Sequence, residues 1–193
     1  VGNKVVLPGA AYIESSIQSP GVIRQSGDVV RIVFGELGGS KSARAIRIQD
    51  ALENAGVNCE LSSDVVKTLW TKFLFISSVA GLTSACRTRI SDLLDNPGYL
   101  ELLLDIMREV EDVGRARGVD LDKDVVLKTQ RYVEEAVKDI TASLHIDLEN
   151  GRRMELDTFT GAVVRLGAQA NIATPINDLL YKILKPHAEG RVS

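Results

Sequence analysis

The chain has 193 residues, of which 45% are hydrophobic and 25% charged, a balance typical of one globular domain, or of one domain with part of another. Its 23 basic and 26 acidic residues give a net charge of −3 without a basic patch, which argues against nucleic acid as a partner. The longest apolar run, "FLFISSVAGL", is far shorter than the ~20 residues that span a bilayer, so no membrane partner is predicted.

The N-terminus lacks a basic segment followed by an apolar one, so the sequence predicts no signal peptide. Cys59 and Cys86 have neither a metal-binding nor a redox spacing. We expect both to be reduced thiols that serve packing in a cytoplasmic protein, and we expect no metal site.

Short β-type runs separated by turn residues open the chain: "KVVLPGAAYIE", "GVIRQS" and "DVVRIVFGEL". Ser26-Gly27-Asp28 predicts a hairpin turn between the second and third runs. Apolar residues at helical spacing after Lys41 then predict a helix that Gly56 ends. Because three short strands and one helix bury little surface, we expect this segment to be the tail of a larger α/β domain.

The pattern is almost wholly helical from Asp64 onward. Gly118 fits the position just past a helix end, and Asp120 or Asp122 fits the N-cap of the next helix. Thr174 and Pro175 fit the N-cap and first position of the last helix. The predicted helices cover residues 64–87, 98–118, 122–143, 155–171 and 175–187.

Lys72 lies in "LWTKFLFISS", within the first long helix. At about 100° per residue it shares one side of the helix with Ile76 and Ala80, away from Lys67 and Thr71. The periodicity leaves two interpretations open. The lysine stem can cover apolar surface while the ammonium reaches water, or the ammonium can sit in a cleft as a proton donor tuned by partial burial and a carboxylate.

Ser143 precedes Glu155 by 12 positions in "SLHIDLENGRRMELDTFTG". Glu155 is predicted to open an amphipathic helix, where a first-turn acid is favoured by the helix dipole. Taken singly, Ser143 is a helix-end hydroxyl and His145 a solvated helix residue. The occurrence of Ser143 and Glu155 together with Lys72 is harder to explain by these local roles.

These stretches, in this order and spacing, resemble the C-terminal two thirds of a ketopantoate reductase, or 2-dehydropantoate 2-reductase. The matching pieces are "SPGVIRQSG", "VFGELGG", "ALENAGVNCELSSDVVKTLWTKFLFISSVAGLTSA", "EVEDVGRARGVDL", "SLHIDLENGRRMELDTFTGAVVRLG" and "ATPINDLLYKIL". The resemblance implies an α+β fragment. Its residues 1–62 would be the terminal strands and helix of a Rossmann-type domain, and its residues 63–193 an all-α substrate domain.

The resemblance also implies an activity, namely NADPH-dependent reduction of the ketone of 2-dehydropantoate to pantoate, on the route to coenzyme A. Lys72 aligns with the family's general acid, whose ammonium stabilises the developing alkoxide and supplies its proton. Glu155 aligns with the acid that bonds the substrate hydroxyl and helps to position the lysine. Ser143 aligns with a hydroxyl that binds the substrate carboxylate. The implied partners are a small 2-keto acid and, compatible with the family, a second copy in a homodimer.

Two positions depart from the family. Ile76 and Ala80 stand on the lysine's side of the helix, where relatives usually carry asparagines, so they present an apolar surface to the substrate. A reductase of another branched 2-keto acid is therefore an alternative. A non-catalytic helical dimerisation or ligand-sensing module is another, favoured by the missing asparagines and disfavoured by Lys72, Ser143 and Glu155.

No G-x-G-x-x-G turn follows a strand near the start of the chain, so the residues that would bind the cofactor are not identified. "GELGGS", at residues 35–40, has the wrong spacing and is predicted to be a loop. Because the chain begins at Val1 and runs directly into a strand, we expect a fragment, inactive alone, that binds NADP weakly or not at all.

Overall fold

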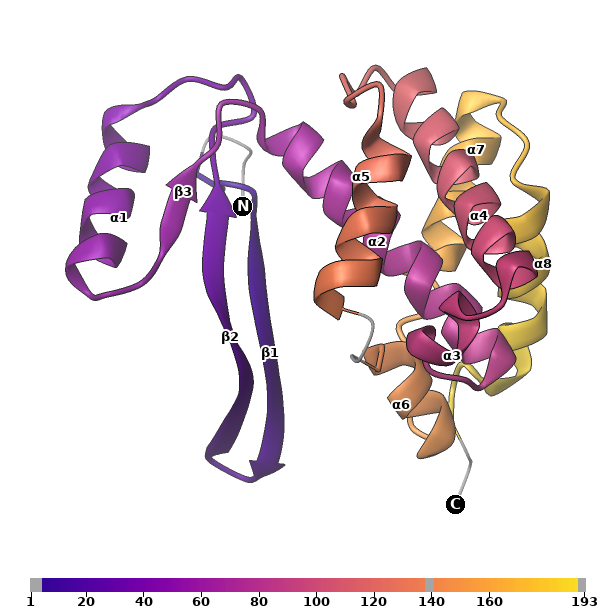
Figure 1. The fold of residues 1–193 in the computed structure, drawn as a ribbon. Helices are drawn as coiled ribbons and strands as arrows, with labels where there is room; N and C mark the ends of the chain where they lie inside the picture. The colour runs from indigo at the N-terminus through magenta and orange to yellow at the C-terminus, as the bar shows by residue number, and fades with distance from the viewer. Residues whose placement is uncertain (1–4, 138–140, 191–193) are drawn as a thin grey trace. The chain divides into compact units, whose positions relative to one another are not determined.

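The computed structural model describes residues 5–137 and 141–190, with side chains for all of these except 27–29 and 137. Contacts divide the chain into two compact units, Val1–Leu69 and Trp70–Ser193. Figure 1 shows the sheet in the first unit and a group of packed helices in the second.

The sheet of the first unit is ordered β1-β2-β3. β1 (Gly9–Ser19) and β2 (Val22–Phe34) are antiparallel, and β3 (Cys59–Leu61) pairs with the end of β2 in parallel. The parallel pair is joined by α1 (Ala43–Asn54), as a parallel connection requires a crossover. The Ser42 hydroxyl caps α1 by accepting from the Ala45 amide at 3.2 Å.

The hairpin predicted at Ser26-Gly27-Asp28 is wrong. β2 is continuous there, and its pairing moves from Val30 to Ser26 between two adjacent residues of β1, which is a bulge. The chain instead reverses at Pro20-Gly21, where Gly21 has the positive φ of 80° that tight turns need. Bulges and turns use the same small and polar residues, so the local sequence does not distinguish them. β3 was not predicted because three residues carry no readable alternation.

The predicted helix after Lys41 is confirmed as α1, and Gly56 follows its end with a φ of 77°. Only Ala45 of α1 is buried, while Ile46 and Ile48 are 41% and 42% exposed. The hairpin also exposes large apolar side chains, namely Ile13, Ile17, Val22 and Ile23. Such shallow burial is consistent with part of a larger domain, and the Rossmann-type topology stays a prediction.

The second unit is helical. Its first helix, α2, begins in the first unit and continues into the second. A π-helical turn, Val133–Val137, follows α5, and a 3₁₀ turn, Lys185–His187, follows α8. The helices are α2 (Val65–Cys86), α3 (Ile90–Leu94), α4 (Pro97–Ala116), α5 (Val125–Tyr132), α6 (Ser143–Glu149), α7 (Thr160–Ala170) and α8 (Pro175–Leu184).

Three predicted helices, those beginning near residues 64, 98 and 175, are confirmed as α2, α4 and α8. Gly118 follows α4 with a φ of 81°, and Thr174 and Pro175 are the N-cap and first residue of α8, as predicted.

The single helix predicted over 122–143 is wrong, because α5 ends in the π-helical turn and α6 starts anew. The N-cap of α5 is Asp124, not Asp120 or Asp122 as predicted. Arg115 donates to the carbonyls of Leu121 and Asp122 and holds the preceding loop outside the helix.

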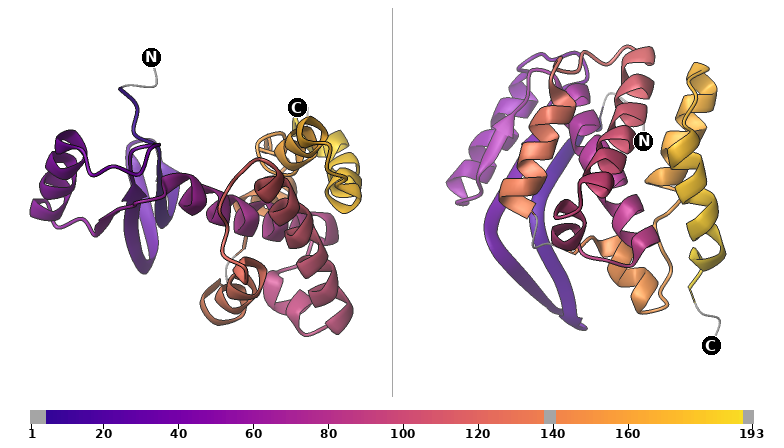
Figure 2. Two further views of the ribbon diagram at one scale, coloured as in Figure 1. Left: turned by 90° about the horizontal axis from the view of Figure 1, so that it is seen from above. Right: turned by 45° about the vertical axis from the view of Figure 1, so that its right-hand side comes forward.

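α2 is the central helix of the second unit, and Figure 2 shows it running among the other helices. Every residue of α2 is buried or half-buried. Its Trp70 donates to the Val110 carbonyl of α4 at 3.1 Å. Its Phe75 meets Tyr132 of α5 edge to face, with ring centroids 5.3 Å apart.

α2 is also the helix of the described chain whose length and composition would allow it to cross a membrane. Its most apolar window has a mean hydropathy of 1.3, and 44% of that window is buried inside the structure. A core helix of a globular unit has the same character, and its contacts with α4 and α5 give α2 that role.

Candidate functional site

Lys72 lies on α2 between the Trp70 anchor and the small residues of the second half of the helix. Its side chain is half-buried, and this burial lowers the pKa of the ammonium below the usual 10.5. Ile76, one turn later, is half-buried, and Ala80, two turns later, is 3% exposed. Partial burial, and the lowered pKa that it causes, fit both interpretations of Lys72.

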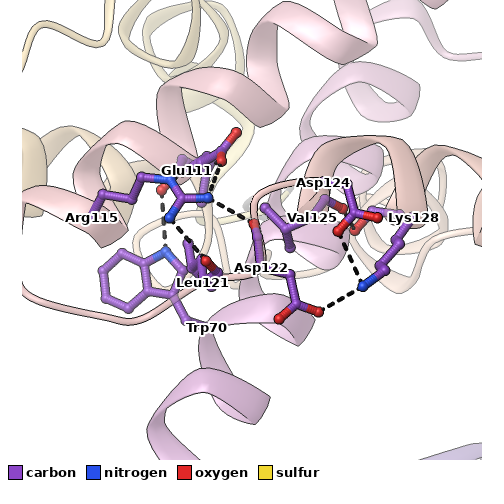
Figure 3. A network of polar contacts seen from close by, with 10 residues as sticks. Trp70, Glu111, Arg115, Leu121, Asp122, Asp124, Val125 and Lys128 are labelled. Atoms are coloured by element: carbon purple, nitrogen blue, oxygen red, sulfur yellow. Dashed lines mark hydrogen bonds and ion pairs between the residues drawn. The ribbon is translucent and has the colours of Figure 1, made fainter.

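The start of α2 is fixed by local caps and by a polar network. Asp64 caps the helix by accepting from the Lys67 amide at 2.9 Å. Figure 3 shows the indole of Trp70, a residue of α2, beside Arg115 of α4. The indole bond to α4 sets the rotation of α2 only two residues before Lys72. The position of Lys72 is therefore determined by packing between helices and not by a flexible loop.

Ser143 and Glu155 lie in two other segments that meet the second half of α2. Ser143 is the first residue of α6, and Glu155 lies between α6 and α7; both are exposed. Their buried sequence neighbours pack in one apolar cluster with Ala80. Its buried members are Ala80, Leu144, Leu148, Met154, Leu156, Leu184 and Ala188.

This cluster brings the three predicted segments together at the Ala80 end of α2. Lys72 precedes Ala80 by two turns, about 12 Å along the helix axis at 1.5 Å per residue. Ile76 lies between them. That Lys72, Ser143 and Glu155 open into one cleft, with Ile76 and Ala80 against the substrate, stays a prediction.

Glu155 does not open α7, contrary to the sequence prediction. α7 begins at Thr160, and Glu155 precedes a turn in which its carbonyl accepts from the amides of Thr158 and Phe159, at 3.0 and 3.3 Å. The apolar residues that suggested an earlier start, such as Leu156, are buried from this turn. The helix-dipole explanation for a first-turn acid therefore does not apply to Glu155.

His145 is buried, contrary to the prediction of a solvated residue. It is 3% exposed, and its Nε2 lies 3.3 Å from a carboxylate oxygen of Glu149. The distance permits an ion pair when the ring is protonated, but the geometry is not that of a hydrogen bond, and neither ring nitrogen has a hydrogen-bond partner among the described residues. A single histidine in an amphipathic segment gives no sequence signal for this burial.

Sequence reasoning also missed a polar group beside Glu155. Tyr181 of α8 donates to the Asp157 carboxylate at 2.6 Å, and Lys185 lies 3.0 and 3.2 Å from its two oxygens. The hydroxyl of Tyr181 and then the Lys185 ammonium lower the pKa of Asp157. The i, i+4 spacing of Tyr181 and Lys185 was visible, but nothing in the sequence linked them to Asp157.

The glycine loop before α1 does not fit a dinucleotide phosphate. Glu36 occupies the N-terminal end of α1, where it accepts from the Ser42 hydroxyl at 2.5 Å and from Arg44 at 2.6 and 2.7 Å. These bonds, that of Arg44 first, lower the pKa of Glu36 to about 2, so a carboxylate already holds the place of an anion. Gly39 serves packing, since a Cβ there would lie 2.3 Å from the Ser63 carbonyl oxygen.

Two of the hollows on the described surface are lined by none of the predicted site residues. One, of about 460 Å³, is lined by α1 residues from Arg44 to Leu52. The other, of about 260 Å³, lies where α7 is followed by α8, near Pro175. Among the described residues, no group of three or more His, Cys, Asp or Glu could hold a metal ion. Cys59 and Cys86 are free thiols whose pKa is raised by burial.

Comparison with known proteins gives consistent matches. The family model "Ketopantoate reductase PanE/ApbA C terminal" matches residues 64–188. The "Uncharacterized oxidoreductase YkpB" of Bacillus subtilis is 26% identical over 180 residues, 93% of this chain and 59% of that protein. The "2-dehydropantoate 2-reductase" of Mycobacterium tuberculosis is 27% identical over 188 residues, 97% of this chain and 61% of that protein.

Solved structures agree. The crystal structure of a PanE/ApbA family ketopantoate reductase from Ralstonia eutropha has a TM-score of 0.83 and 26% identity, over 94% of this chain and 59% of that one. The chain thus spans about 60% of the length of the relatives that it matches. Because the family model covers well over half of the residues, the chain belongs to the ketopantoate reductase family and matches its C-terminal part.

Proposed function

We propose that this chain is the substrate-binding and proton-donating part of a nicotinamide-dependent 2-keto acid reductase, acting on 2-dehydropantoate or a close analogue. The observation that carries the proposal is the half-buried Lys72 on the central helix, with its lowered pKa, in a chain of this family. A cofactor held outside this chain would supply the hydride. The glycine loop at residues 35–40 does not fit a pyrophosphate, because Glu36 is bonded at the N-terminal end of α1. The chain alone is therefore expected to be inactive.

Each predicted residue has one role in this proposal. The Lys72 ammonium donates the proton to the carbonyl oxygen and stabilises the alkoxide as it forms. Glu155 accepts from the substrate hydroxyl and helps to orient Lys72, and Ser143 binds the substrate carboxylate. Ile76 and Ala80 line the substrate's side chain. The meeting of their segments at the Ala80 cluster supports this assignment.

Removal of Lys72 tests the activity. In a protein completed by a nicotinamide-binding segment, NADPH oxidation should depend on 2-keto acid, and Lys72→Ala should lower kcat by about 10²-fold or more, the usual contribution of a general acid. Lys67→Ala, on the same helix, is the matched control and should remain active. If the Lys72 and Lys67 variants are equally active, Lys72 is not the general acid.

The apolar surface at Ile76 favours a second substrate, a branched 2-keto acid whose side chain is wholly apolar. A polar group buried against Ile76 without a partner costs about 1–3 kcal/mol, or roughly ten- to a hundredfold in kcat/KM. Ile76→Asn should therefore improve kcat/KM for 2-dehydropantoate and not for the apolar acid. If the unmodified protein prefers 2-dehydropantoate and Ile76→Asn leaves the ratio unchanged, Ile76 does not face the polar end of the substrate.

A further inference from the structure

The turn that carries Glu155 is held from both sides by the C-terminal end of the chain. Before Glu155, the amide of Met154 donates to the carbonyl of Ala188 at 2.8 Å. After Glu155, the Asp157 carboxylate accepts from Tyr181 at 2.6 Å and from Lys185 at 3.0 Å. Three contacts from α8 and the turn after it thus bracket a single exposed acid.

The packing around these contacts leaves little room for movement. The ring of Tyr181 lies against Gly161, where an added Cβ would come within 2.8 Å of its Cε2 atom. The same ring packs against the apolar cluster that contains Met154 and Leu156. The hydroxyl of Tyr181 is therefore directed by a ring that touches the turn on both sides of Asp157.

The two contacts to Asp157 differ in strength. The side chains of Asp157 and Lys185 are 62% and 47% exposed, so their ion pair is screened by water and contributes little by itself. The Tyr181 hydroxyl donates a short hydrogen bond to the charged Asp157 carboxylate, and the ring that carries it is half-buried. Lys185 also lies 5.2 Å above that ring, which joins the three side chains into one group.

We propose that Asp157 is a positioning residue, which fixes the turn carrying Glu155 to α8 through Tyr181 and Lys185. The inference rests on the proposed function in one respect, namely the role of Glu155 in substrate binding. The fixing of the turn is a property of this chain and is testable without substrate. The group touches neither substrate nor cofactor in the proposal, and it acts only by limiting the positions of the Glu155 carboxylate.

Hydrogen exchange in the 193-residue chain tests the fixing of the turn. Asp157→Asn and Tyr181→Phe should each speed amide exchange in residues 151–159 by about fivefold or more, because local opening becomes easier. Asp178→Asn is the matched control. It removes the same kind of Asp–Lys pair from α8, with Lys182 at 2.6 Å, and does not touch the turn. Unchanged exchange in both variants would overturn the inference, whatever the activity of the protein.

A double-mutant cycle tests whether Asp157 acts on the reaction through Glu155. It uses the protein completed by a nicotinamide-binding segment. Asp157→Asn alone should lower kcat/KM by about tenfold, and in a Glu155→Gln background it should add almost nothing, because the two changes remove one effect. A purely structural role predicts additive losses, and additivity would overturn the positioning role. If Glu155→Gln alone leaves kcat/KM unchanged, the proposed role of Glu155 fails, and the positioning role fails with it, even where exchange shows that the turn is fixed.

Discussion

Glu109 is a buried carboxylate that joins two helices of the second unit. It is 9% exposed on α4 and accepts from the amides of Ile176 and Asn177, at 2.8 and 2.9 Å, and from the Asn177 side chain at 2.7 Å. Pro175 has no amide hydrogen, so these are the first donors of α8, and a carboxylate is well placed against them. The Thr174 side chain makes no capping hydrogen bond, and Glu109, which is far away in the sequence, caps α8 in its place.

Removal of this cap should destabilise the helical unit. Glu109→Ala leaves buried donors without an acceptor, and we expect a loss of about 2–4 kcal/mol in the free energy of unfolding. Glu109→Gln should lose less, since one amide oxygen remains to accept. Glu101→Ala, an exposed position on the same helix, is the control. Urea unfolding followed by circular dichroism measures all three, and a loss at Glu109 no larger than at Glu101 would contradict the capping role.

The proposed role of Lys72 as general acid predicts a pH dependence of the reaction. A general acid must be protonated, so kcat/KM should fall as pH rises through the pKa of Lys72 in the substrate-free protein. Because burial lowers that pKa, the midpoint of the fall should lie below 10.5. Lys72→Arg keeps the positive charge at all accessible pH values. It should abolish this fall at alkaline pH and lower kcat by about 10²-fold. If the arginine variant loses activity over the same alkaline pH range, the titrating group is not Lys72.

At the scale of helices and strands, Gly114 controls how closely α4 approaches α2. A Cβ at Gly114 would lie 2.3 Å from the Trp70 indole nitrogen. This nitrogen is the atom that bonds the Val110 carbonyl, one turn earlier on α4. The bond and the close packing therefore depend on the same missing side chain.

Gly114→Ala should push the indole away and break its bond, at a cost of about 1–3 kcal/mol in stability, the usual penalty of overpacking a core. Gly98→Ala is a matched control on the same helix, because its Cβ would meet only the Asn96 side chain at an ordinary 3.4 Å. It should be neutral or slightly stabilising. Thermal unfolding of the two variants measures the difference, and equal midpoints would show that the indole moves without cost.

The elements that the sequence predicted well have a long, regular apolar spacing, as in α2, α4 and α8, or a strong cap such as Pro175. The errors lie where long-range contacts override local pattern. The bulge in β2 depends on its pairing with β1, and the late start of α7 depends on the burial of Leu156 against other helices. At the site, the predicted residues came from family resemblance. The Asp157 group could not be predicted, since its partners are 24 and 28 residues away.

At the scale of the whole molecule, the chain should bind a nicotinamide dinucleotide weakly or not at all. The helix N-terminus nearest to a glycine loop is occupied by the Glu36 carboxylate, which repels a phosphate. Titration calorimetry of NADPH into the chain should show no binding in the micromolar range, whereas a protein completed by a nicotinamide-binding segment should bind. Micromolar binding to the chain alone would contradict the expectation that the cofactor is held elsewhere.

The long β1–β2 hairpin has a consequence for the behaviour of this chain in solution. β1 is an edge strand of 11 residues, and the outer part of the hairpin presents Ile17 and Ile23 at 76% and 65% exposure. An edge strand with exposed apolar side chains is a template for pairing with another copy. With a net charge of only −3 and an isoelectric point near 5.5, repulsion between copies is weak. Colloidal stability of the purified chain should therefore be lowest in mildly acidic buffer and at high concentration.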